Sequence, residues 1–120
     1  AAVDAPPRPQ WVDGLIRAEG TGADPGFATA QGRLKAARAA ELDAKRRLAE
    51  MIAGLQLDGQ TRVTDFVTEH DSIATQVEAI MVDSFVVETR FDNDAAYVTV
   101  AVPGTRVWSV LGPELRRQSR

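Results

Sequence analysis

The segment from Phe27 to Ala53 constrains the fold most, because its apolar residues recur at steps of three and four positions. Such spacing predicts one long amphipathic helix, and Gly54 directly after it is a typical stop signal. The many alanines favour helix and give a narrow apolar face that can lie close to a sheet. The expected stripe comprises Ala30, Leu34, Ala37, Ala40, Ala44, Leu48, Met51 and Ile52.

The remaining pattern predicts strands and one shorter helix. We expect strands at 15–20, 55–67, 84–91 and 95–102, and a second helix at about 72–82. The strand at 55–67 changes phase near Thr64, so we expect a bend there; a hairpin turn at "DG" (58–59) is the alternative. "DNDA" reads as the turn of a hairpin. The fold class is therefore α+β, with both helices packed on one face of a mainly antiparallel sheet of about four strands.

A single domain fits the length of 120 residues. Residues 1–10, rich in alanine and proline, are expected to form a flexible leader, and 11–111 one α+β domain. "TRVWSVL" (105–111) is expected to form a closing turn, and 112–120 a flexible tail. The first residue is not Met, and no long apolar run is present, so we expect a mature or trimmed start.

Composition argues against several classes of function. With no cysteine, the chain offers neither a thiol nucleophile nor a zinc–thiolate site. The net charge of −3 argues against generic nucleic-acid binding, which depends on phosphate neutralisation. We expect no catalytic residue, no cofactor and no metal.

Three short motifs resemble functional sites, but a structural role accounts for each of them better. "GTGADPG" (20–26) lacks the Lys-Ser/Thr of a phosphate-binding loop, and its spacing does not match a dinucleotide fingerprint. His70 has acidic neighbours but no evident nucleophile, which favours a loop or helix cap. "DND" (92–94) lacks the later Gly and Glu of a calcium loop, and a type I or I′ turn accounts for it.

The cationic turn Lys45, Arg46 and Arg47 is expected to be a solvated helix surface. Each cation has an acid four residues away: Glu41 for Lys45, Asp43 for Arg47 and Glu50 for Arg46. No aromatic residue lies between Phe27 and Phe66, as a nucleic-acid platform would require.

Apolar residues off the main stripe are candidates for a protein interface. Leu42, Ala49 and Ala53 lie on a second side of the predicted helix. We expect them to act together with an exposed strand edge, since such edges pair readily unless covered. Trp108 is a further candidate.

"ARAAELDAKRRLAEMIAGLQLDGQTRVTDFVTEHDSI" resembles the signature of small bacterial outer-membrane lipoproteins of the Lpp-twenty type, which include the flagellar protein FlgP. "PQWV" before the first strand, "FVVE" and the strand "YVTVAVP" are also similar, so the resemblance covers about residues 9–103.

The resemblance implies a non-enzymatic structural and assembly module that self-associates in an outer-membrane or flagellar-motor-associated structure. It also implies a periplasmic or outer-membrane location, homo-oligomers, and other envelope or flagellar proteins as partners. Membrane attachment in this family uses a lipidated N-terminal cysteine, which is not present in this chain. The alternative is a periplasmic binding module for a small ligand or peptidoglycan, using the concave side of the sheet.

Overall fold

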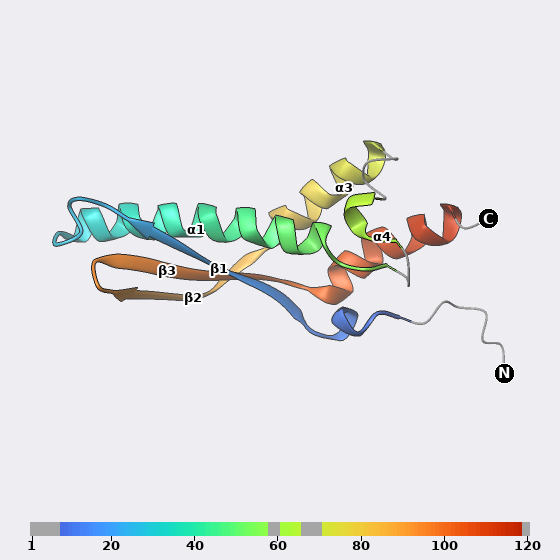
Figure 1. The fold of residues 1–120 in the computed structure, drawn as a ribbon, viewed down its shortest axis with the longest axis horizontal. Helices are drawn as coiled ribbons and strands as arrows, with labels where there is room; N and C mark the ends of the chain where they lie inside the picture. Colours follow the sequence, from blue (N-terminus) through green and yellow to red (C-terminus); the bar gives the residue numbers. More distant parts are fainter. Residues whose placement is uncertain (1–7, 58–60, 66–70, 119–120) are drawn as a thin grey trace.

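The computed structural model describes residues 8–57, 61–65 and 71–118. A long helix lies along a three-stranded antiparallel sheet, and further helices gather at one end of the elongated molecule (Figure 1). The α+β class is confirmed. In chain order the elements are η1 (Gln10–Asp13), β1 (Leu15–Ala23), α1 (Ala30–Ala53), α3 (Asp71–Val82), β2 (Phe85–Asp92), β3 (Ala95–Pro103) and α4 (Gly104–Gln118).

The sheet has the order β1-β3-β2, so β3 is central and the other two strands are edges. β1 pairs with β3 along its whole length, from Leu15 opposite Pro103 to Ala23 opposite Ala95. β2 and β3 form the expected hairpin. Asn93 and Asp94 between them have φ angles of 50° and 64°, which identify a type I′ turn.

Helix α1 is confirmed and begins three residues after the expected start at Phe27. Thr29 precedes it, and its hydroxyl accepts a hydrogen bond from the Gly32 N–H at 2.9 Å. The buried stripe advances by strict steps of four residues, a ridge that runs obliquely to the helix axis and can follow a twisted sheet. Leu34 and Met51, expected in the stripe, are about half exposed. The stripe consists of Gly32, Ala36, Ala40, Ala44, Leu48 and Ile52.

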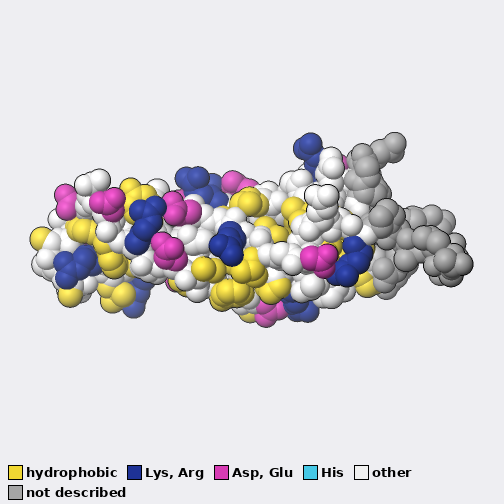
Figure 2. Space-filling model, turned by 90° about the horizontal axis from the view of Figure 1, so that it is seen from below, with side chains coloured by type: hydrophobic (Ala, Val, Ile, Leu, Met, Phe, Trp, Pro, Cys, Tyr) yellow, Lys and Arg dark blue, Asp and Glu magenta, His cyan; other side chains and the backbone are white. Residues whose placement is uncertain are grey.

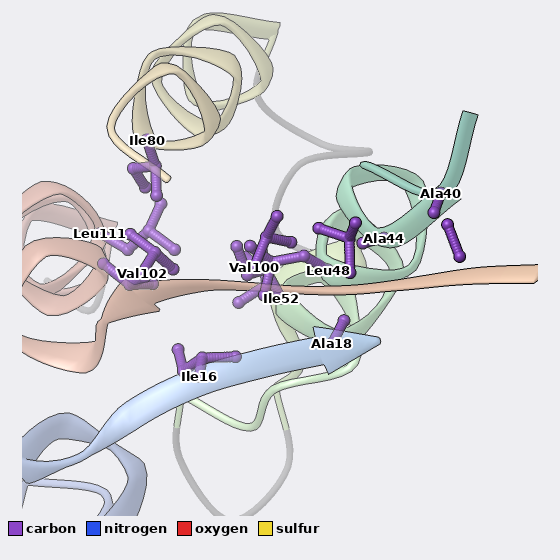
Figure 3. Packing of buried hydrophobic residues seen from close by; sticks show 14 of the residues in the cluster. Ile16, Ala18, Ala40, Ala44, Leu48, Ile52, Ile80, Val100, Val102 and Leu111 are labelled. Carbon is purple, nitrogen blue, oxygen red and sulfur yellow. The ribbon is translucent and has the colours of Figure 1, made fainter. Parts of the chain in front are cut away.

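The main packing partners of α1 are β1 and β3. Gly20 and Gly22 make this approach possible, because a Cβ atom at either position would overlap the backbone of α1. The glycines that resembled a phosphate loop in the sequence therefore serve helix–strand contact. Figure 3 shows the core that results, with α1 side chains directed at the sheet and residues of α3 and α4 closing one end.

Two sequence expectations about secondary structure are wrong. The described residues of the segment 55–67 do not form one bent strand: a single antiparallel bridge joins Gln56 and Arg62, and residues 63–65 are helical. The Leu57 N–H donates to the Thr61 carbonyl at 2.8 Å, so the described part of this segment is closer to the hairpin alternative. Accordingly the described sheet has three strands, not four.

The expected closing turn at 105–111 is part of helix α4, which continues to Gln118, into the stretch assigned to the tail. Val107 and Leu111 explain the helix, because they are four residues apart and both fully buried in the core. This packing outweighs Gly112 and Pro113, the local signals for a helix end. α3 packs mainly against α4 and not over the sheet beside α1.

Candidate interaction surface

Strand β2 is the most exposed regular element of the sheet. All eight of its residues are exposed, and among the described residues it pairs with β3 only. Four of its side chains are large and apolar, and each is between 43% and 47% exposed. Strand edges with apolar side chains are uncommon on proteins that remain monomeric. These four residues are Phe85, Val86, Val87 and Phe91.

The register places two of these four side chains, Val86 and Phe91, on the side of the sheet that carries α1. Val86 lies opposite Val100, and Phe91 lies opposite Ala96, both buried residues of β3. A bulge at Val87 shifts the register between Val86 and Glu88. Helix α1 packs mainly on β1 and β3. The face of β2 on the same side of the sheet therefore lies beside the helix and not under it. Phe27 reaches it at one end, where its ring meets that of Phe91 edge-on at 5.9 Å between centroids.

The edge at β1 differs, because α1 closes part of it. The Thr21 N–H donates to the Asp43 carboxylate at 3.0 Å. Arg46 and Arg47 also donate to this carboxylate, at 2.7 Å and 3.0 Å. The hydrogen bond from Thr21 and the two guanidinium groups lower the Asp43 pKa to about 2. A charged side chain that occupies the backbone groups of an edge is a recognised protection against strand addition.

The face of the sheet turned away from α1 carries paired charges. Arg90 of β2 spans the sheet to Glu19 of β1, with Nη2 at 3.3 Å from the carboxylate, and its guanidinium stacks over the Tyr97 ring at 4.4 Å from the centroid. Glu88 lies 3.7 Å from Arg90 Nε. Seen from this side, acidic and basic side chains alternate with apolar patches, and no single charge sign dominates (Figure 2).

The predicted interface residues occupy two separate places. Leu42 is 69% exposed on α1, and Ala49 and Ala53, further along that helix, are half-buried. Trp108 lies on α4, where its ring packs edge-on against Trp11 at 6.0 Å between centroids. Trp108 is half-buried at the contact between α4 and η1, whereas Leu42 is exposed on α1.

The β2 residues were not singled out from the sequence. The run "FVV" (85–87) indicated a strand, and an exposed edge strand can carry the same residue types as a central one. What separates the two cases is the order of strands in the sheet, which periodicity does not encode.

The three expected ion pairs of the cationic turn are confirmed. Lys45 lies 3.1 Å from Glu41, Arg47 lies 3.0 Å from Asp43, and Arg46 lies 2.8 Å from Glu50. The cations are thus engaged along the helix surface. Exposed pairs of this kind add little stability each, up to about 1 kcal/mol.

An open depression lies between β1 and α1. Three of the four charged residues that line it are already paired: Glu19 contacts Arg90, Arg47 contacts Asp43, and Glu50 contacts Arg46. Its lining residues are Arg17, Ala18, Glu19, Arg47, Glu50 and Met51.

Chemistry-bearing groups are sparse in the described part of the chain. Within residues 8–57, 61–65 and 71–118, no cluster of His, Cys, Asp and Glu side chains has an arrangement suited to a metal ion. Among the residues whose burial is described, within 8–57, 61–65 and 74–113, every buried side chain is apolar. His70 lies outside the described residues. The described helices include none with the length and hydropathy needed to cross a membrane.

Neither protein-family models nor curated proteins give a match to this chain.

Proposed function

We propose that this chain is a non-enzymatic assembly module that associates with copies of itself in a bacterial envelope structure. The observation that supports it most is the exposed apolar edge at β2, which pairs with β3 alone among the described residues, in a sheet whose other edge has one backbone group, the Thr21 N–H, bound by Asp43. Association would remove apolar surface from water and satisfy the outward backbone groups of the strand.

The envelope setting rests on the sequence resemblance to outer-membrane lipoproteins. We extend the proposal to a periplasmic or outer-membrane location, a lipid anchor supplied outside this chain, and a flagellar-motor-associated structure as one such assembly. Other envelope proteins are proposed partners. Fractionation of cells that produce the full precursor tests this part, and a protein recovered only in the cytosol contradicts it.

Sedimentation velocity across a concentration series tests self-association of the chain. We expect the average mass to rise with concentration, without any added small molecule. A mass that stays at 13.0 kDa up to the highest soluble concentration contradicts the proposal. The variant Leu42→Ser examines the helix surface predicted from the sequence: a lower mass at equal concentration places that surface in the contact, and an unchanged mass removes it.

The alternative, a binding module for a small ligand or peptidoglycan, predicts a monomer that sediments with purified peptidoglycan. The depression beside β1 is the surface it would use. Co-sedimentation that is lost on substitution of Arg17, with no change of mass in solution, would replace the assembly proposal.

A further inference from the structure

We infer that β2 pairs antiparallel with β2 of a second copy, about a twofold axis that passes through Thr89. The inference rests on the proposed function, and it specifies the surface, the partner and the register. The result is one continuous six-stranded sheet in the order β1-β3-β2-β2-β3-β1, which removes both unprotected edges at once.

The charges of β2 select this register. Glu88 and Arg90 are two residues apart, so they point to the same face of the sheet and carry opposite signs. In the pairing centred on Thr89, Glu88 of each copy lies opposite Arg90 of the other, which gives two complementary pairs about the axis. Moving the centre to Glu88 or to Arg90 instead places like charges opposite each other.

The apolar residues agree with the same register. In this register Val87 lies opposite Phe91 of the second copy, and both side chains are about half exposed. Pairs of an aromatic and a β-branched residue are favourable across strands. Residues 88–90, which lie in the regular part of β2, form the centre of the contact, and the bulge at Val87, opposite Phe91, marks its two ends.

The β1 edge does not offer an equivalent contact. The Thr21 N–H donates a hydrogen bond to the Asp43 carboxylate, which also accepts hydrogen bonds from Arg46 and Arg47. A strand added there would have to break these bonds. The edge at β2 shows no such bond to a side chain among the described residues, so strand pairing is favoured there.

A charge reversal in the full chain tests the register. Glu88→Arg alone places two cations opposite each other across the axis, and Arg90→Glu alone does the same with two anions. Each single variant is expected to raise the dimer dissociation constant at least tenfold. The double variant Glu88→Arg/Arg90→Glu restores opposite signs and is expected to recover dimerisation. Far-UV circular dichroism verifies that all three variants are folded.

Cysteine cross-linking gives an independent readout, because the chain has no cysteine of its own. Thr89→Cys places two thiols opposite each other on the axis, with Cβ atoms about 4.5–5.5 Å apart, close to disulfide range. Mild oxidation should give a covalent dimer. Thr21→Cys is the matched control, an exposed threonine on the β1 edge, and should remain monomeric under the same conditions.

The outcomes separate this inference from the proposed function. If the chain self-associates, the charge variants do not weaken association and Thr89→Cys gives no covalent dimer, the β2 contact is wrong. Assembly then uses another surface. A monomer at every concentration overturns both. Loss in the single variants without recovery in the double variant overturns the register centred on Thr89.

Discussion

The carboxylate of Asp43 on α1 accepts a hydrogen bond of 3.0 Å from the backbone N–H of Thr21 on β1. This bond ties the middle of the long helix to one edge of the sheet. It also makes the two edges of the described sheet unequal, since Asp43 binds a backbone group of β1 and no side-chain bond of this kind is seen on the backbone of β2 within the described residues. The functional proposal depends on this inequality.

Asp43 should make stability depend on pH in the acid range. Its pKa is lowered to about 2 in the folded protein, so folding stabilises the ionised form of this carboxyl group. The stabilisation is complete above about pH 4 and is lost as the pH falls towards 2. Asp43→Asn should therefore be less stable than the wild type at pH 6, with the difference shrinking at low pH. Urea denaturation at several pH values measures this, and a constant difference contradicts it.

Gly20→Ala should destabilise the protein strongly. The added Cβ atom would overlap the backbone of α1 at Ala40 and Ala44, so the helix must move away from β1. Overpacking of this kind costs roughly 1–3 kcal/mol and sometimes more. Gly14→Ala is the control, because a Cβ atom added at that position would have no neighbour within 4 Å. Equal thermal stability of the two variants would show that α1 does not lie this close to β1.

Leu48 and Leu42 form a matched pair on α1. Leu48 is fully buried, whereas Leu42 is 69% exposed. Leu48→Ala should lower the free energy of unfolding by about 2–5 kcal/mol. Leu42→Ala should change it by less than about 0.5 kcal/mol. Denaturant titration of dilute protein compares them, and a larger effect at Leu42 would contradict the orientation of the helix.

Asp94→Gly should stabilise the β2–β3 hairpin. Asp94 has a φ angle of 64°, a left-handed conformation that glycine adopts without a steric penalty. Asn-Gly is also the preferred sequence of a type I′ turn. We expect a gain of about 0.5–1 kcal/mol, which thermal denaturation can detect. Asp94→Val, with a β-branched side chain, should have the opposite effect; a gain from both substitutions is incompatible with this turn.

Local patterns predicted the elements whose signals are continuous along the chain. The spacing of three and four residues and Gly54 predicted α1, the strand pattern at 95–102 predicted β3, and "DNDA" predicted the turn. The same spacing rules predicted the ion pairs of the cationic turn. In the stripe of α1, however, Leu34 was placed wrongly, because the helix meets the sheet along an oblique ridge whose direction depends on the sheet's twist.

The sequence by itself determined the long helix, the hairpin and the charge pairs, since each follows from contacts within a few residues. Only the tertiary structure decided that residues 104–118 form a helix, because burial of Val107 and Leu111 outweighs the local effect of Gly112 and Pro113. It also decided that β2 lies at an edge while β1 is closed by Asp43. Strand order is set by pairing between residues far apart in the sequence. The residues of one strand do not by themselves indicate whether it has one neighbouring strand or two.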